Sequence, residues 1–139
     1  MDFLFICRGN VGRSQMAEGL FAKMTNGKYK VISAGTKLSG LEQTLRELPL
    51  AENLILCMQE EGIDVSNNIR RQLTEKMTSE ASKIVLVIDE SDPVPDYLRN
   101  NEKVTTWIVP DPKGTDLDFH RKIRDQIKER IEELVSGLK

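Results

Sequence analysis

The sequence predicts a single α/β domain in which helices cover both faces of a four-stranded parallel sheet. Two observations carry this prediction. Short, continuous apolar runs alternate along the chain with segments of helical periodicity, and the connections between the apolar runs are long enough to be crossovers. The chain of 139 residues is long enough for one hydrophobic core and too short for two comfortable ones.

The first part of the chain predicts a strand, a helix and a second strand. Phe3–Ile6 is an apolar run that leads into a glycine-containing loop, and it predicts the first buried strand. The helix is expected from about Arg13 to Met24, where apolar residues recur at spacings of three and four. Lys30–Ala34 predicts the second strand, which Gly35 ends.

A less patterned connection and an amphipathic helix come next. The connection Thr36–Pro49 is rich in Leu, Glu and Lys and has no clear period. We expect it to be a loop with a short helix, at the edge of the sheet that carries the active residues. Apolar residues at helical spacing from Leu50 to Met58 predict the amphipathic helix, and Gly62 stops it.

The second half of the chain predicts two more strands and a long closing helix. Ile84–Ile88 is the clearest buried strand of the chain, and Val104–Val109 predicts the fourth. Between them, a short helix is expected to open at Asp92-Pro93. The closing helix is predicted by its apolar face, which consists of Phe119, Ile123, Ile127, Ile131, Leu134 and Leu138.

Composition and charge exclude several classes of partner. The net charge is -2, so the chain has no general basic surface for nucleic acid or for an anionic membrane. No apolar run approaches the roughly 20 residues of a membrane-spanning helix, and the apolar run at the N-terminus is too short for a signal peptide. We therefore expect a cytoplasmic protein in which both cysteines, Cys7 and Cys57, stay reduced.

The segment Cys7–Ser14 predicts a phosphate-binding loop that contains a nucleophile. It joins the first strand to the first helix, and two glycines let its backbone curl so that N–H groups surround an anion. The helix dipole, these N–H groups and the Arg13 guanidinium favour the thiolate of Cys7 near neutral pH. Arg13 can also bind two phosphate oxygens at once. The phosphate-binding residues are expected to be Arg8, Gly9, Asn10, Val11, Gly12, Arg13 and Ser14.

Two side chains of this loop have more than one interpretation. Ser14 can donate its hydroxyl to the thiolate, and it can cap the helix N-terminus. Asn10 can hold the loop through its amide, and it can equally serve an ordinary turn.

An acidic residue is predicted beside the loop, directly after the fourth strand. Asp111 lies between Pro110 and Pro112, which fix the backbone so that the carboxylate is held on a stiff loop. A carboxylate held in this way suits proton donation. The same stretch is also compatible with a plain turn.

The remaining candidates have structural explanations. Cys57 falls within an amphipathic helix and has no basic neighbour, so partial burial without reactivity is expected. His120 lies beside the apolar face of the closing helix and is expected to be exposed. Asp89 ends the third strand, as in a receiver-like module, but Arg8 and Gly9 stand where such a module needs acidic residues for Mg²⁺. No histidine and cysteine cluster has metal-ligand spacing, so neither a metal nor a cofactor is expected.

Five segments occur in an order that resembles a known family. They are Cys7–Ser14, Ser33–Thr36, Gly62–Ser66, Arg71–Thr74 and Pro110–Pro112, and they span nearly the whole chain. This order is similar to that of the low-molecular-weight protein tyrosine phosphatases and the arsenate reductases related to them. The resemblance implies one phosphatase-like domain over residues 1–139, with the same sheet and helices as predicted above.

The resemblance also implies roles for individual residues. Cys7 would be the nucleophile, Arg13 would bind the phosphoryl group and stabilise its transition state, and Asp111 would be the general acid. Asn10 and Ser14 would support the loop. The implied activity is a cysteine-dependent phosphomonoester hydrolase, in the first place a protein tyrosine phosphatase that acts through a phosphocysteine. We expect a monomer whose partner is a phosphorylated protein or a small phosphomonoester.

The chain departs from the family's common pattern at three positions. Gly12 stands where a second cysteine is frequent, which removes protection of Cys7 by a neighbouring disulfide. Lys113 replaces the aromatic residue that usually packs on a phosphotyrosyl ring, and Thr36–Pro49 contains no aromatic residue for the opposite wall. Gln15 replaces a proline, with little expected effect on the helix start. Hydrolysis of a phosphomonoester is therefore a firmer expectation than specificity for phosphotyrosine.

Two alternatives stay open. Arsenate reduction would place arsenate in the same loop, but the intramolecular form in the family uses a further cysteine pair near the third strand. No cysteine lies between Ile84 and Lys103, so this chain would need an external thiol. The other alternative is a phosphoprotein-binding module without turnover. The presence of both Cys7 and Asp111 argues against such a module, because binding alone requires neither.

Overall fold

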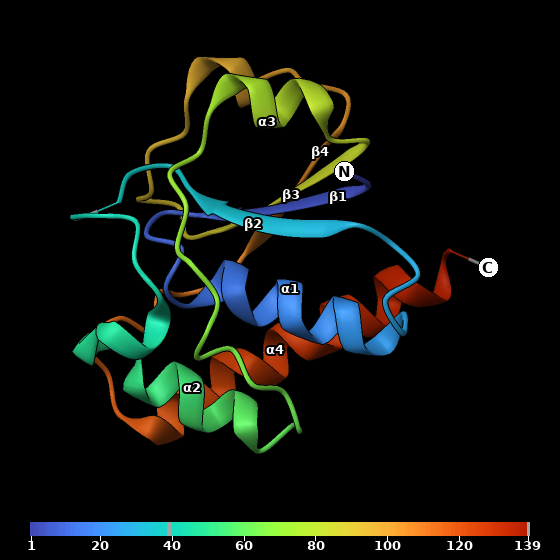
Figure 1. The fold of residues 1–139 in the computed structure, drawn as a ribbon. Coiled ribbons are helices and arrows are strands. Elements are labelled where there is room, and N and C mark those ends of the chain that lie inside the picture. The colour runs from blue at the N-terminus through green and yellow to red at the C-terminus, as the bar shows by residue number, and fades with distance from the viewer. Residues whose placement is uncertain (39, 139) are drawn as a thin grey trace.

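A four-stranded parallel sheet forms the centre of the computed structural model, which describes residues 1–38 and 40–138. The strands are β1 (Phe3–Cys7), β2 (Val31–Gly35), β3 (Lys83–Ile88) and β4 (Val104–Ile108), in the order β2-β1-β3-β4. Every pair of neighbouring strands is parallel. The predicted fold class is confirmed, and β1 and β3 lie side by side at the centre of the sheet (Figure 1).

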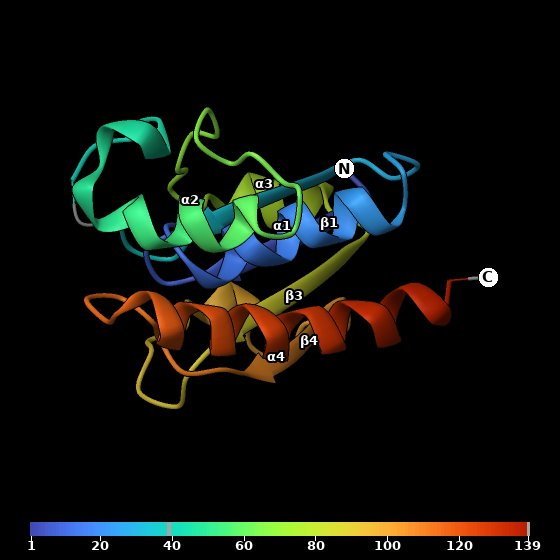
Figure 2. The ribbon, with the colours of Figure 1, turned by 90° about the horizontal axis from the view of Figure 1, so that it is seen from below.

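Helices cover both faces of this sheet (Figures 1 and 2). The helices α1 (Arg13–Met24), α2 (Glu52–Gln59) and α4 (Leu117–Ser136) lie on one face. Helix α3 (Glu75–Glu80) lies on the other, together with the short helix η3 (Asp96–Leu98). Within the described residues, no helix has both the length and the apolar character needed to cross a bilayer.

The alternation of side chains along β1 contributes to both halves of the core. Phe3 and Phe5 point to the face that α1 covers, where their ring centroids lie 4.5 and 5.6 Å from that of Phe21. Leu4 and Ile6 point to the opposite face. Because every residue of β1 is buried, the strand has a continuous apolar sequence rather than an alternating one.

Two predictions of helix boundaries differ from the structure. The short helix η3 begins at Asp96 rather than at Asp92, because the Asp92 carboxylate accepts the backbone N–H of Asp89 at 2.9 Å and closes a turn instead. The helix predicted from Leu50 is a short helix, η2 (Pro49–Ala51), followed by α2, and Leu50 itself is exposed.

Two shorter elements complete the chain. The connection Thr36–Pro49 contains the short helix η1 (Leu45–Glu47), as expected, and Leu45 is its buried anchor. Helix α3 was not expected, because six residues are too few for a periodic pattern to emerge. It begins where the Thr74 hydroxyl accepts the backbone N–H of Met77.

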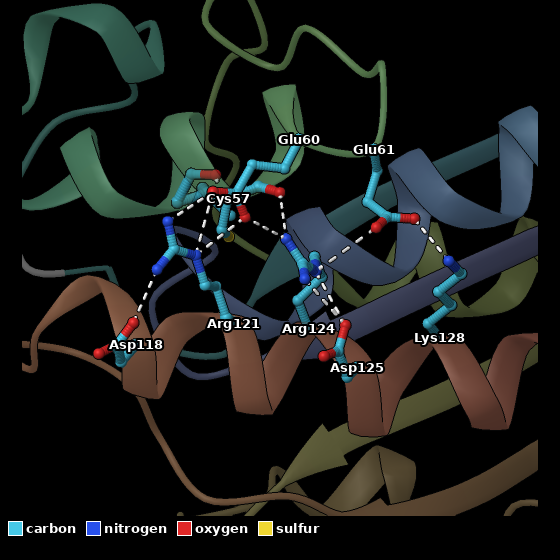
Figure 3. A network of polar contacts seen from close by, with 9 residues as sticks. Cys57, Glu60, Glu61, Asp118, Arg121, Arg124, Asp125 and Lys128 are labelled. Atoms are coloured by element: carbon cyan, nitrogen blue, oxygen red, sulfur yellow. Dashed lines mark hydrogen bonds and ion pairs between the residues drawn. The ribbon is translucent and has the colours of Figure 1, made fainter.

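Charged side chains fasten α2 to α4 (Figure 3). Glu60, directly after α2, accepts hydrogen bonds from Arg121 and from Arg124, with the shortest N–O distance 2.7 Å in each case. Arg124 also donates to the carbonyl of Cys57 at 2.8 Å. The hydrogen bonds from Arg121, and then those from Arg124, lower the pKa of Glu60 to about 2.

Candidate active site

A pocket of about 400 Å³ opens at the carboxyl ends of the central strands, where ligands bind in parallel α/β sheets. Cys7 and the loop that follows it line the pocket, and so do Arg13 and Asp111. The three residues for which the sequence predicts chemical roles therefore converge on one cavity, although Asp111 is far from the other two in sequence.

The backbone of the loop between β1 and α1 is shaped by two residues. Asn10 has a φ of 53°, in the left-handed region that asparagine tolerates better than most residues. Gly12 precedes α1 with φ -125° and ψ -94°, and a Cβ there would lie 3.3 Å from the ring of Pro112. Within the described part of the chain, the N–H groups of residues 8–12 donate to no backbone carbonyl, so they are available to an anion.

The Cys7 sulfur lies at the end of a short chain of hydrogen bonds. Its Sγ is 2.9 Å from the Ser14 hydroxyl oxygen, and Asn10 Nδ2 donates to that same oxygen at 2.7 Å. Asn10 uses one acceptor site of the hydroxyl and leaves its proton free, so the hydroxyl can donate to a Cys7 thiolate. The N-cap residue of α1 is Gly12, and Ser14 lies inside the first turn of the helix, so the helix-cap interpretation of Ser14 is wrong.

Asn10 is completely buried and holds the loop with both ends of its amide. Its Nδ2 also donates to the Ser33 hydroxyl at 2.9 Å, and its Oδ1 accepts the backbone N–H of Arg71 at 2.8 Å. Gln15 Nε2 donates to Oδ1 at 3.2 Å. The expected loop-holding role of Asn10 agrees with these contacts, and Gln15 takes part in them rather than serving only at the helix start.

The Arg13 guanidinium reaches from α1 to the segments that follow β3 and β4. Its Nη1 donates to Asp92 at 2.9 Å and to the Val109 carbonyl at 3.1 Å, and its Nη2 lies 3.5 Å from Asp111 Oδ2. The side chains of Arg13 and Asp92 are almost completely buried. These partners fix the guanidinium at the wall of the pocket that contains Cys7.

Asp111 lies at the rim of the pocket, on the loop after β4. Its Oδ1 accepts the backbone N–H of Lys113 at 2.9 Å, and its side chain is 37% exposed. A backbone hydrogen bond from Thr115 to Pro112 closes the turn that follows. A carboxylate held in this way, yet open to water, can give a proton to a bound molecule and take one from water.

His120 is buried, so the expectation of an exposed histidine is wrong. Only 4% of it is accessible, and it lines the same pocket as Cys7. Its Nδ1 lies 2.9 Å from the carbonyl oxygen of Asp116, which can only accept, so Nδ1 carries the proton. Periodicity could not show this burial, because it arises where the first turn of α4 packs against the loop that carries Asp111.

Cys57 is buried, and its burial is complete rather than partial as expected. It lies in α2, and its thiol donates to the Leu54 carbonyl at 3.3 Å. Burial raises the pKa of this thiol to about 11. Cys57 is not among the residues that line the pocket.

Three residues that line the pocket with largely buried polar side chains had no role there predicted from the sequence: Arg70, Asp92 and His120. Asp92 had a signal, because it comes shortly after the carboxyl end of the central strand β3, and Cys7 lies at the carboxyl end of the other central strand. Arg70 had almost none. It stands in an unpatterned stretch, next to Arg71–Thr74, and reaches the pocket only because this stretch crosses the end of β2.

Comparisons with known proteins agree with this geometry. The family model for the low molecular weight phosphotyrosine protein phosphatase matches residues 2–139. Arsenate reductase 2 of Staphylococcus haemolyticus is 31% identical over 128 residues, which cover 92% of this chain and 91% of that protein.

Solved structures of both kinds of enzyme share the fold. The low molecular weight protein tyrosine phosphatase from T. tengcongensis has a TM-score of 0.82 and 27% sequence identity, with 99% of each chain covered. An arsenate reductase in its phosphate binding state has a TM-score of 0.80 and 29% identity, with 100% of each chain covered. The chain therefore belongs to the low molecular weight phosphotyrosine protein phosphatase family, and its relatives include arsenate reductases.

Proposed function

We propose that the protein is a cysteine-dependent phosphomonoester hydrolase that acts through a phosphocysteine. The observation that carries this proposal is the convergence of the Cys7 sulfur, the Arg13 guanidinium and the Asp111 carboxylate on one pocket. These groups match the three needs of phosphoryl transfer: a nucleophile, stabilisation of charge and a proton donor. A module that only binds phosphate needs neither the nucleophile nor the donor.

In the first step, the Cys7 thiolate attacks phosphorus as the bond from phosphorus to the leaving oxygen breaks. Protonated Asp111 gives its proton to that oxygen, and the alcohol departs. Arg13 and the N–H groups of the loop from Arg8 to Ser14 stabilise the charge on the equatorial oxygens. The short contact from Ser14 to the sulfur supports the thiolate before attack.

In the second step, water attacks the phosphocysteine and the bond between sulfur and phosphorus breaks. The Asp111 carboxylate takes the proton from this water, inorganic phosphate leaves, and the Cys7 thiolate is restored. The Ser14 hydroxyl, 2.9 Å from the sulfur, stabilises the departing thiolate. Both steps need only groups of this chain, the substrate and water.

The walls of the pocket favour a substrate without an aromatic ring. Among the described residues, its apolar lining is aliphatic and includes Leu38, Leu48 and Leu50. Lys37 and Lys113 stand at its mouth and are exposed. This arrangement supports a phosphomonoester on an acidic or aliphatic carrier over a phosphotyrosyl side chain.

Arsenate reduction by an external thiol is the second candidate, and the arsenate reductases among the relatives favour it. In this reaction the Cys7 thiolate would displace water from arsenate to form a sulfur–arsenic bond. A thiolate from outside would then attack Sγ, form a disulfide with Cys7 and leave arsenic two electrons richer, as arsenite. Cys57 is unsuited to the second thiol role because it is buried and its pKa is raised to about 11.

Two assays on the reduced protein separate the candidates. The first is hydrolysis of p-nitrophenyl phosphate without added metal, and the second is arsenite release from arsenate with glutathione as the external thiol. Each is run on the native protein, on Cys7→Ser and on Cys57→Ser, which serves as the matched control.

We expect hydrolysis that disappears in Cys7→Ser and persists in Cys57→Ser. Arsenite release without hydrolysis would overturn the proposal in favour of arsenate reduction. A folded protein that binds phosphate but performs neither reaction would instead be the binding module without turnover.

A further inference from the structure

His120 is a polar side chain that the protein encloses almost completely at the wall of the pocket. It lies in the first turn of α4, and only 4% of the residue is exposed. It lines the same pocket as Cys7 and Asp111. No step of the proposed reaction uses its ring, although a buried polar group ordinarily has a hydrogen-bond partner.

Both contacts of Nδ1 show that this nitrogen carries the ring proton. The Asp116 carbonyl oxygen, 2.9 Å away, can only accept. The Thr115 hydroxyl oxygen, 3.2 Å away, gives its single proton to the Pro112 carbonyl at 2.6 Å, so it also accepts from Nδ1. In the neutral ring, Nε2 therefore has a lone pair and acts as an acceptor.

The Nε2 atom of His120 is open to the pocket. No described residue donates a hydrogen bond to it, and the nitrogen is not sealed within the protein, so its small accessible surface faces the pocket that the ring lines. Its partner must then come from a ligand or from water, because an acceptor left without a donor in such a place is costly.

The wall that carries His120 is fixed before a ligand arrives. The end of α2 that follows η2 and the first turn of α4 lie side by side (Figure 2), and Asn53 of α2 donates to the Thr115 carbonyl at 3.1 Å. The backbone N–H of Thr115 donates to the Pro112 carbonyl at 3.0 Å. The ring is therefore oriented in advance, as a group that discriminates between ligands has to be.

The donor that Nε2 needs belongs to the carrier and not to the phosphoryl group. The oxygens of a phosphomonoester dianion only accept hydrogen bonds, so they cannot satisfy a second acceptor. Beyond the phosphoryl group, the pocket is lined by aliphatic side chains such as Leu48 and Leu50. The exposed cations Lys37 and Lys113 at the mouth disfavour an ammonium group on the carrier, which leaves a hydroxyl as the donor.

We propose that His120 is a specificity-determining residue: its Nε2 accepts a hydrogen bond from a hydroxyl group on the carrier of the phosphoryl group. The substrate class is then a phosphomonoester of a hydroxylated aliphatic alcohol. This inference rests on the proposed function, because it requires a phosphomonoester in the pocket.

Two matched esters test this role. Glycerol 1-phosphate carries hydroxyl groups beside the phosphoester, and n-propyl phosphate has the same carbon chain without them. The ratio of their kcat/KM values is measured for the native protein, for His120→Phe, which removes the acceptor, and for His120→Gln, whose amide oxygen restores one. Lys122→Gln, at an exposed position of α4, is the matched control. A change that merely loosens the pocket lowers both kcat/KM values and leaves their ratio unchanged.

We expect the ratio of glycerol 1-phosphate to n-propyl phosphate to fall about fivefold to tenfold in His120→Phe, as for the loss of one hydrogen bond to a neutral group. His120→Gln should recover most of the ratio, and Lys122→Gln should match the native protein. An unchanged ratio in a folded His120→Phe protein would overturn the proposal, and so would a His120→Gln protein that behaves like His120→Phe.

The nitrogen signals of the ring test the same contact without turnover. His120 is the only histidine of the chain, so NMR of protein made with isotopically labelled histidine reports this ring alone. The spectra are recorded on Cys7→Ser at about pH 8, above the range in which histidine ordinarily titrates. The proton should lie on Nδ1, and glycerol 1-phosphate should shift the Nε2 signal more than n-propyl phosphate or inorganic phosphate does. A proton on Nε2, or equal shifts with the three ligands, would contradict the proposal. If His120→Phe does not fold, this measurement decides alone.

Failure of this inference is distinguishable from failure of the proposed function. A protein that hydrolyses p-nitrophenyl phosphate but shows no selective shift of Nε2 would remain a phosphatase, and His120 would lose its role in specificity. A protein without hydrolysis whose Nε2 signal still responds to glycerol 1-phosphate would keep this binding contact and lose the proposed reaction.

Discussion

Asp92 and Arg13 form an ion pair that is nearly closed off from solvent, with Oδ2 of Asp92 2.9 Å from Nη1 of Arg13 and side-chain exposures of 5% and 2%. The same carboxylate oxygen accepts the backbone N–H of Asp89 at the end of β3. Asp92 thus helps to fix the Arg13 guanidinium, together with the Val109 carbonyl at 3.1 Å. Arg13 is oriented before any oxyanion arrives, which spares the cost of ordering it during the reaction.

Replacement of Asp92 by asparagine should therefore destabilise the protein in a way that phosphate can relieve. Loss of one partner from a buried ion pair costs on the order of 3 kcal/mol. An oxyanion in the loop would face Arg13 and take over part of the missing charge, so inorganic phosphate should raise Tm more in Asp92→Asn than in the native protein. Thermal unfolding with and without phosphate measures both effects.

Asp96→Asn is the control for this experiment, because Asp96 is 97% exposed and pairs with Arg99 at a distance of 3.6 Å. Its stability should stay within about 0.5 kcal/mol of the native value. An Asp92→Asn protein as stable as this control, or one that phosphate stabilises no more than the native protein, would contradict the structural role of the pair.

The general-acid role of Asp111 predicts that the effect of Asp111→Asn depends on the leaving group. For an alkyl phosphate, whose departing oxygen needs a proton, kcat should fall by about 10²–10⁴. For p-nitrophenyl phosphate the loss should be much smaller, because nitrophenolate leaves without protonation. The comparison of kcat for the two substrates is the measurement. Equal losses for both would mean that Asp111 acts through its contact with Arg13 and not as an acid.

The parts of the fold that could be predicted are those whose pattern repeats along the chain. The strands are continuous apolar runs because both faces of the sheet are covered, and α4 shows its buried face over many turns. Helix α3 was not predicted, because it contains only six residues and its start depends on the Thr74 cap. The start of η3 was misplaced because Asp92, which resembles a helix cap in sequence, turns toward Arg13.

The site was predictable to the extent that its residues are consecutive in sequence or lie at strand ends. Cys7, Arg13 and Asp111 satisfy this condition. Arg70 and His120 do not, because each reaches the pocket only after a loop has packed against another element. No periodicity or spacing in one sequence encodes such contacts.

Substitution of Gly35 is expected to reduce activity and stability, because this position has no room for a side chain. A Cβ at this position would lie 2.6 Å from the Arg8 carbonyl oxygen and 3.0 Å from the Asn10 nitrogen, so the loop beside Cys7 would have to move. We expect Gly35→Ala to lower kcat/KM strongly and to cost about 1–3 kcal/mol of stability. Steady-state kinetics and urea unfolding measure the two effects.

Gly137→Ala is the matched control for Gly35→Ala. A Cβ at Gly137 would meet no atom nearer than 3.5 Å, and the φ of -79° suits any residue. This variant should keep full activity and native stability. Equal behaviour of the two variants would show that the close approach at Gly35 is not needed by the loop.

The two cysteines should differ sharply in reactivity. Burial raises the pKa of the Cys57 thiol to about 11, and its side chain is inaccessible, so it should resist iodoacetamide at neutral pH until the protein unfolds. Cys7 opens into the pocket and should be labelled in the folded state. Mass spectrometry of the labelled peptides, with and without denaturant, measures which cysteine is alkylated first. Labelling of Cys57 before Cys7 in the folded protein would contradict this prediction.

The lowered pKa of Glu60 predicts that the contact between α2 and α4 becomes weaker in acid. Hydrogen bonds from Arg121 and Arg124 hold the pKa of Glu60 at about 2, below the ordinary value of 4.5. A carboxylate whose pKa is lower in the folded state stabilises that state above its ordinary pKa, and the contribution is lost as pH falls from 4.5 toward 2. Glu60→Gln should therefore be less stable than the native protein at neutral pH, and this difference in the free energy of unfolding should narrow across the acid range.

Glu102→Gln is the control, because it makes an equal change of charge at an exposed position. Its difference from the native protein should not narrow when urea unfolding is followed against pH. A constant gap between Glu60→Gln and the native protein over the same range would mean that the Glu60 carboxylate holds the helices by shape and not by its charge.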